Sequence, residues 1–198
     1  MARRVANIIV LAGPNGAGKS TTGPALLRDT LGITEFVDAD AVARGLSAFA
    51  PEKVAVQAGK IMLRRIRELA RQHVDFAFET TLASRLFAPW LDRLRKERYE
   101  VHVVFLYLPS ADVAVDRVKN RVQMGGHDVP EGVVRRRYRA GLRNFFRLYQ
   151  PLAATWRVYD NSGAGGPRLI ASGEGKKVTH INDGKMWNRI LEEFGHEK

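Results

Sequence analysis

A glycine-rich segment near the start of the chain constrains the fold more than any other feature. Gly13–Ser20 reads GPNGAGKS and matches the pattern G-x-x-x-x-G-K-[ST] at every position. An apolar run precedes it, and a stretch compatible with a helix follows. The glycines let such a loop curl so that successive backbone N–H groups point at one cluster of phosphates. The segment therefore predicts a strand–loop–helix unit that binds nucleotide phosphates, helped by the positive end of the helix dipole.

The residues of this loop have separate predicted roles. We expect Lys19 to hold the β- and γ-phosphates of ATP and the Ser20 hydroxyl to ligate Mg²⁺. The predicted nucleotide-binding residues are Gly13, Asn15, Gly16, Ala17, Gly18, Lys19, Ser20 and Thr21. The loop alone does not separate a kinase from an ATPase motor or a GTPase.

Short apolar runs alternate with longer amphipathic stretches along the chain. Such runs are typical of strands buried on both faces of a parallel sheet. The expected strands are Val5–Ala12, Glu35–Ala39, Val74–Phe78, Val101–Leu108 and Trp156–Tyr159. The expected helices are Lys19–Leu31, Pro51–His73, Arg85–Arg98, Asp112–Met124 and Glu131–Tyr149. This order predicts an α/β fold, doubly wound around a mostly parallel sheet of about five strands.

Two segments depart from this alternation. The sequence GGHDVP at positions 125–130 separates two basic helices, and we predict a helical lid over about residues 117–139. Beyond about residue 166 we expect an appendage in which Arg168–Ser172 and Lys177–Ile181 form a hairpin, followed by a short helix over Met186–Phe194. We interpret residues 1–198 as a single domain, a length that suits one core.

Two acidic clusters follow predicted strands. Asp38 and Asp40 end the second strand, where a two-residue period would place them on one face. Glu79, with the hydroxyls of Thr80 and Thr81, ends the third strand. Ligands bind at the carboxyl ends of strands in open α/β sheets, and a kinase needs a carboxylate there to orient the acceptor hydroxyl. These five residues are the predicted substrate site, although Asp40 could instead cap a helix.

Arginines supply the third part of the predicted site. Positions 112–147 hold nine basic residues against four acidic ones, a pattern that also fits a solvated helix face. Phosphoryl transfer spreads negative charge that arginines stabilise. Because Arg135, Arg136 and Arg137 are consecutive, they cannot all point inward. The predicted catalytic residues are Asp40, Lys19, Arg121 and Arg136.

The overall composition narrows the class of protein. A net charge of +11 favours anionic partners, and the absence of cysteine excludes disulfides and thiolate chemistry. No apolar run approaches the roughly 20 residues of a membrane span. We therefore expect a cytoplasmic protein without a membrane partner.

The sequence resembles the zeta-toxin family of P-loop kinases, in particular its short chromosomal branch. The matching segments, between about Asn7 and Ser172, are GPNGAGKSTT, VDADAVARGLS, FETTLA, RVKNRVQMGGHDVPEGVVRRRY, and RVYDNSG with PRLIA after it. The resemblance implies a P-loop kinase fold and ATP-dependent phosphorylation of a UDP-activated amino sugar such as UDP-N-acetylglucosamine. It also introduces an antitoxin protein as a candidate partner.

By matching motif, the resemblance implies that Asp40 acts as the base. It also implies that Glu79 and Thr81 contact the acceptor and that the lid arginines contact the γ-phosphate. Two alternatives stay open. One is a kinase for a nucleoside, a polynucleotide end or an antibiotic. The other is a nucleic-acid-binding P-loop ATPase, but the acidic strand ends would repel a nucleic-acid backbone. Its candidate stacking rings, Tyr138, Phe145 and Phe146, fall at the helical spacing of core residues.

Overall fold

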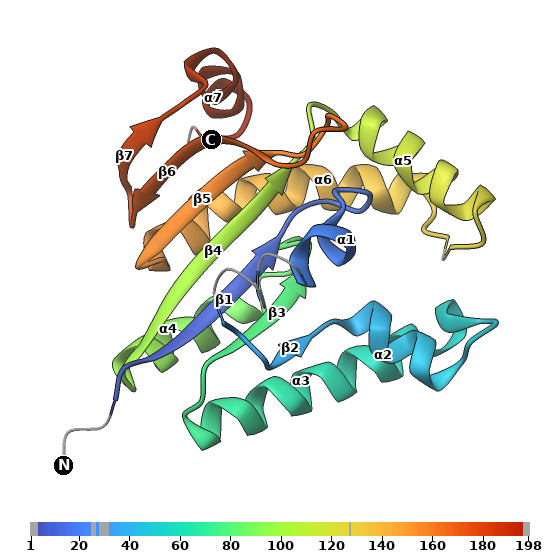
Figure 1. Cartoon of the computed structure of the whole chain (residues 1–198), viewed down its shortest axis with the longest axis horizontal. Coiled ribbons are helices and arrows are strands. Elements are labelled where there is room, and N and C mark those ends of the chain that lie inside the picture. Colours follow the sequence, from blue (N-terminus) through green and yellow to red (C-terminus); the bar gives the residue numbers. More distant parts are fainter. Residues whose placement is uncertain (1–3, 25–26, 28–31, 127, 196–198) are drawn as a thin grey trace.

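A seven-stranded sheet forms the centre of the protein, which a computed structural model describes over residues 4–24, 27, 32–126 and 128–195 (Figure 1). The strand order is β2-β3-β1-β4-β5-β6-β7. The strands are β1 (Ala6–Ala12), β2 (Phe36–Val37), β3 (Phe76–Thr80), β4 (Tyr99–Tyr107), β5 (Thr155–Asp160), β6 (Arg168–Glu174) and β7 (Lys177–Ile181). The first five pair in parallel, and β6 and β7 join antiparallel.

Helices connect the parallel strands, as right-handed crossovers require. In the view of Figure 1, α4 and α6 lie behind the sheet, and α2 and α3 lie beside its β2 edge. The α-helices are α1 (Lys19–Pro24), α2 (Ala39–Leu46), α3 (Ala55–Gln72), α4 (Phe87–Lys96), α5 (Ala111–Gln123), α6 (Glu131–Asn144) and α7 (Gly184–Ile190). Shorter turns of helix are η2 (Pro51–Val54), η3 (Phe145–Tyr149), η4 (Gln150–Leu152) and η5 (Leu191–Gly195). Among the described helices, none combines the length and apolar character needed to cross a bilayer.

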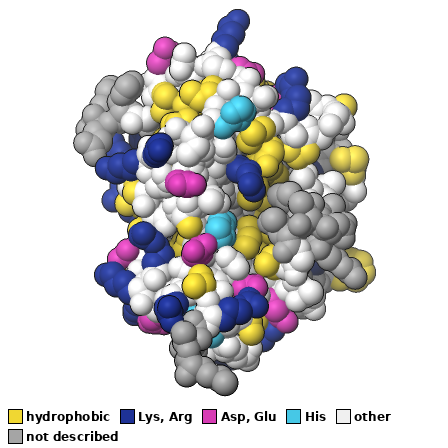
Figure 2. All heavy atoms as spheres, turned by 60° about the vertical axis from the view of Figure 1, so that its left-hand side comes forward, with side chains coloured by type: hydrophobic (Ala, Val, Ile, Leu, Met, Phe, Trp, Pro, Cys, Tyr) yellow, Lys and Arg dark blue, Asp and Glu magenta, His cyan; other side chains and the backbone are white. Residues whose placement is uncertain are grey.

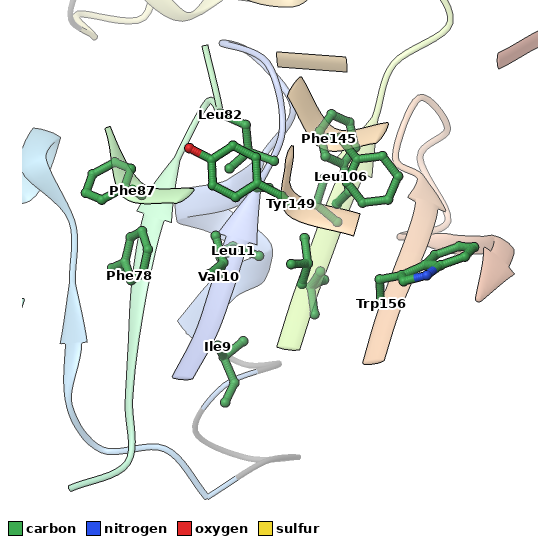
Figure 3. Packing of buried hydrophobic residues seen from close by; sticks show 14 of the residues in the cluster. Ile9, Val10, Leu11, Phe78, Leu82, Phe87, Leu106, Phe145, Tyr149 and Trp156 are labelled. Carbon is green, nitrogen blue, oxygen red and sulfur yellow. The ribbon is translucent and has the colours of Figure 1, made fainter. Parts of the chain in front are cut away.

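Aromatic side chains pack between the sheet and the helical segments α4 and η3 (Figure 3). Phe78 on β3 meets Phe87 on α4 with ring centroids 4.9 Å apart, and Phe145 on η3 meets Phe105 on β4 at 5.2 Å. Tyr138 and Phe145 are 3% and 1% exposed, so they belong to the core rather than to a stacking surface. This burial confirms the prediction that the two rings are core residues, and it holds α6 against the sheet.

The sheet register decides which residues reach the first loop. Leu11 pairs with Glu79 and Ala12 pairs with Thr80, so β3 ends directly beside the start of the glycine-rich loop. Sequence predicted that Glu79 follows the third strand, but β3 begins two residues later than expected and includes both Glu79 and Thr80. Their side chains are therefore held by strand pairing rather than by a loop.

The fold class is confirmed, with one difference in the number of strands. The predicted hairpin forms, but as the two outer strands of the same sheet, so the sheet has seven strands rather than about five. Helix α1 is described only over Lys19–Pro24, and most of the remainder of the predicted helix lies outside the described residues. Residue 127 of the predicted lid also lies outside them.

Candidate active site

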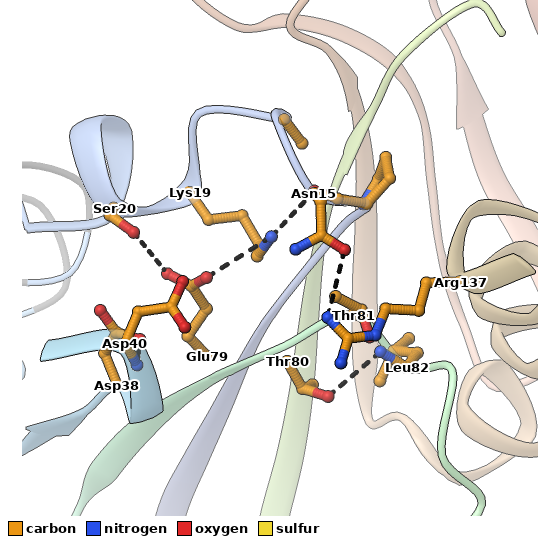
Figure 4. A network of polar contacts seen from close by, with 12 residues as sticks. Asn15, Lys19, Ser20, Asp38, Asp40, Glu79, Thr80, Thr81, Leu82 and Arg137 are labelled. Carbon is orange, nitrogen blue, oxygen red and sulfur yellow. Dashed lines mark hydrogen bonds and ion pairs between the residues drawn. The ribbon is translucent and has the colours of Figure 1, made fainter. Parts of the chain in front are cut away.

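The glycine-rich loop wraps the end of β1. Gly16 and Gly18 both have φ of +78°, a region where residues with a Cβ are strained. Lys19 is 6% exposed, and its Nζ donates to the Pro14 carbonyl at 2.9 Å. The same ammonium lies 3.4 Å from Glu79 Oε1, and the Ser20 hydroxyl donates to Glu79 Oε2 at 3.1 Å (Figure 4). The loop thus meets the end of β3 through one carboxylate.

Several neighbouring groups shift the pKa of the Glu79 carboxyl. Burial raises the pKa of its carboxyl, and the nearby Asp38 and Asp40 raise it further. Lys19 and the Ser20 hydroxyl act in the opposite direction but do not cancel the effect. A carboxylate in this position gains from any cation brought next to it.

Asp38 and Asp40 both line the site, but they do not share a strand face as predicted. Strand β2 ends at Val37 and α2 begins at Ala39, so the two-residue period does not apply. Asp38 is the N-cap of α2: its Oδ1 accepts the Asp40 N–H at 2.9 Å. Capping was the alternative role considered for Asp40, and the structure gives it to Asp38 instead. Burial raises the pKa of Asp38, which is only 8% exposed.

These residues surround one cavity of about 640 Å³. The donor side of its wall comes from the glycine-rich loop and the acceptor side from the ends of β2 and β3. Apolar surface from Ala55, Met62, Phe87 and Val129 completes it. The predicted residues that line it are Asn15, Gly16, Gly18, Lys19, Ser20, Thr21, Asp38, Asp40, Glu79, Thr80, Thr81 and Arg121. Gly13 and Ala17 are buried within the loop and do not line the cavity.

Thr80 and Thr81 shape the chain that leaves β3. Thr80 Oγ1 accepts the Leu82 N–H at 3.1 Å, and Thr81 Oγ1 accepts the Ala83 N–H at 3.4 Å. Leu82 is completely buried with φ of +54°, a conformation that bulky residues rarely adopt. The two hydroxyls therefore stabilise a tight turn at the acceptor side of the cavity.

The structure corrects the choice of arginine on α6. Arg136 is exposed and does not line the cavity, whereas Arg137 does, with Nη1 3.5 Å from Asn15 Oδ1. Val134 and Tyr138 are the buried residues on either side, and they fix the rotation of the helix. Burial lowers the pKa of Arg137. Arg121 of α5 lines the cavity as predicted.

Oxygen donors at the loop fit a magnesium ion. The Ser20 hydroxyl and the Glu79 carboxylate lie within hydrogen-bonding distance of each other, and both are hard oxygen ligands of the kind Mg²⁺ takes beside a nucleotide. Sequence reasoning assigned only Ser20 to the metal and gave Glu79 to the acceptor. Because Glu79 contacts Ser20, its carboxylate can bind either the metal ion or the acceptor.

Comparison with known proteins identifies the type of domain. A protein-family model described as AAA domain matches residues 8–148, well over half of the chain. An uncharacterised protein of Haemophilus influenzae (strain ATCC 51907 / DSM 11121 / KW20 / Rd) is 27% identical over 130 residues, covering 66% of this chain and 91% of that protein.

Two solved structures share the fold. The AvrRxo1-ORF1:-ORF2 complex with ATP is similar over 93% of this chain, with a TM-score of 0.71 and 18% identity. This chain spans 63% of the length of that one. The PezAT chromosomal toxin–antitoxin system of Streptococcus pneumoniae is similar over 100% of this chain and 82% of that chain, with a TM-score of 0.65 and 14% identity. These similarities show a shared fold and agree with the predicted α/β P-loop fold.

Proposed function

The chain belongs to the AAA-domain family, and from this premise we propose that it is a kinase that transfers the γ-phosphoryl group of ATP to a hydroxyl of a small molecule. One observation carries the proposal: the phosphate loop and three carboxylates line a single cavity. Its volume of about 640 Å³ is that of a typical small-molecule site. An ATPase motor has no need of an acceptor side of this kind.

The donor side holds the nucleotide. Backbone N–H groups of the curled loop and the Lys19 ammonium bind the phosphates. Mg²⁺, held by Ser20 and Glu79, would neutralise phosphate charge while bound. Occupation of the loop by phosphates requires Lys19 to turn from Glu79 and the Pro14 carbonyl toward the nucleotide.

Asp40 is the better of the two candidate bases. One oxygen of Asp38 is committed to the Asp40 N–H as the helix cap, and its burial favours the protonated form. Asp40 lines the same cavity without that capping role. A general base needs a carboxylate oxygen free to accept the acceptor's hydroxyl proton, a requirement that Asp40 meets.

Arginines stabilise the charge of the transferred group. Arg121 on α5 and Arg137 on α6 line the cavity from the lid side, opposite the carboxylates. Fixed cations aimed at developing negative charge account for much of the rate enhancement of phosphoryl transfer. Arg137 takes the part that the sequence suggested for Arg136.

We further propose a UDP-amino sugar such as UDP-N-acetylglucosamine as the acceptor, and an antitoxin as a candidate protein partner. Both rest on the zeta-toxin resemblance. On the face shown in Figure 2, Lys and Arg side chains are spread in small groups among Asp and Glu, so this face carries no continuous basic track for a nucleic-acid backbone.

Mass spectrometry tests the activity directly. Purified protein is incubated with Mg²⁺, ATP and UDP-N-acetylglucosamine, beside a sample without protein and the Asp40→Asn variant. The expected result is a sugar nucleotide heavier by one phosphoryl group, formed by the wild type and lost in the variant. An unchanged sugar nucleotide despite measured ATP binding would remove this acceptor. Normal transfer by Asp40→Asn would remove Asp40 as the base.

A further inference from the structure

The chain that leaves β5 passes behind the phosphate loop, outside the cavity. Asn161 follows the last residue of β5 and is 8% exposed. Its side-chain Nδ2 donates to the Ala17 carbonyl at 2.7 Å, and its backbone N–H donates to the Tyr107 carbonyl at 3.1 Å. A Cβ at Gly18 would lie 2.7 Å from the same Nδ2, so the amide is packed directly against the loop.

Arg117 holds Asn161 from the other side. Its Nη1 donates to the Asn161 carbonyl at 2.8 Å, and its Nη2 donates to the Ser162 carbonyl at 2.6 Å. A Cβ at Gly16 would lie 3.0 Å from Arg117 Cβ, so the arginine stem also packs against the loop. The guanidinium therefore fixes the backbone behind the loop, although its position on α5 suggested a place beside the lid.

The contact with Ala17 bears on phosphate binding through peptide geometry. The described backbone contains no cis peptide, and in a trans peptide the C=O and the next N–H point in opposite directions. Holding the Ala17 carbonyl toward Asn161 turns the Gly18 N–H the other way. Backbone N–H groups of this loop are the phosphate donors, and Gly18 lines the cavity.

We propose that Asn161 is a positioning residue for ATP. It orients the Ala17–Gly18 peptide so that the Gly18 N–H faces the phosphates, and Arg117 keeps Asn161 in place. The inference rests on the nucleotide-binding part of the proposed function and is independent of the acceptor.

The main test is Asn161→Asp in the full chain, with the fluorescent N-methylanthraniloyl derivative of ATP and Mg²⁺ as the probe. At about pH 8 the new carboxylate would face the Ala17 carbonyl, and we expect the Kd to rise about tenfold or more. Burial raises the pKa of such a carboxyl, so at about pH 5.5 its protonated form would donate again and much of the loss would be recovered. Because phosphates titrate in the same range, the variant is compared with the wild type at each pH.

Asn144→Asp is the matched control. Asn144 is 6% exposed, and its Nδ2 donates to the Leu82 carbonyl at 2.7 Å, so the substitution disturbs an equally buried amide away from the phosphate loop. Its Kd is expected within about twofold of the wild type. A second variant, Asn161→Ala, deletes the donor without adding charge and should weaken binding about threefold or more at every pH.

The outcomes separate the possible failures. Wild-type affinity in either Asn161 variant, or an equal loss in Asn144→Asp, would overturn the positioning role. Recovery at low pH that is confined to Asn161→Asp supports it, because Asn144→Asp introduces an equally buried carboxyl and would show the same loss and recovery if stability alone were responsible. Failure of the wild type to bind the probe would instead overturn nucleotide binding itself, and the inference with it.

Discussion

The closest approach between α6 and the acceptor side of the site depends on Gly141. A Cβ at this position would overlap the Thr81 carbonyl oxygen and lie 3.5 Å from its carbonyl carbon. The opposing atoms are backbone, and that backbone is also held by Asn144, which donates to the Leu82 and Ala83 carbonyls at 2.7 and 3.2 Å. Gly141→Ala therefore forces either the helix or the turn to move.

Two terms of opposite sign set the size of the effect. Overpacking of a well-packed site costs about 1–3 kcal/mol. Replacing glycine by alanine within a helix returns about 0.5–1 kcal/mol. We therefore expect Gly141→Ala to lower the free energy of unfolding by up to about 2.5 kcal/mol, the difference between these terms.

Gly59 on α3 provides the comparison. A Cβ there would meet no atom within 4 Å, so Gly59→Ala gains the helix propensity without the overlap. The gap between the two variants, measured by urea unfolding followed through tryptophan fluorescence, isolates the steric cost and should be about 1–3 kcal/mol. If Gly141→Ala were stabilised as much as Gly59→Ala, the close approach of α6 to Thr81 would be wrong.

Three further predictions concern single side chains. Lys19→Met should weaken ATP binding about 10- to 100-fold, measured by calorimetry, through loss of a charged phosphate contact. Asp38→Asn should keep the cap, since Asn caps equally well. Because burial raises the pKa of Asp38, the folded wild type binds a proton at this carboxyl more tightly than the unfolded chain does. The wild type therefore loses stability as pH rises through that pKa. The melting temperature of Asp38→Asn should exceed that of the wild type at neutral pH, and the difference should close in acid. Arg137→Ala should lower the rate of phosphoryl transfer about 100-fold with little change in ATP affinity, whereas Arg136→Ala should change neither.

The sequence predicted the donor side of the site more completely than the acceptor side. The phosphate loop is a contiguous motif whose geometry is local, so its residues could be named from spacing alone. The acceptor side depends on where strands end. Strand β2 has only two residues, too short for a two-residue period to extend to Asp40, and Asp38 leaves the strand to cap α2. The two aspartates named from the sequence line the cavity, but the geometry expected for them was wrong.

The choice between neighbouring arginines could have been made from the sequence. Helix residues are about 100° apart, so Val134, Tyr138 and Leu142 define one buried stripe of α6. Arg136 lies roughly opposite that stripe, whereas Arg137 borders it, at the edge where a half-buried cation can enter the cavity. The positions of the apolar residues around the helix therefore indicate that Arg137, and not Arg136, lies beside the buried stripe. In contrast, no local pattern connects Asn161 with Ala17, because their contact depends on strand order.

The electrostatics of the site depend on the closeness of its donor and acceptor sides. Three carboxylates and a phosphate loop line one cavity, and the pKa values of Asp38 and Glu79 are raised. Adding a triphosphate to these groups without cations would increase the repulsion. The buried Lys19, which contacts Glu79, offsets only part of it. The arginines that line the same cavity, Arg44, Arg117, Arg121 and Arg137, supply further positive charge. With these arginines and Lys19 against three carboxylates, the wall as a whole favours an anionic ligand, while the carboxylates favour a cation at the place where they gather.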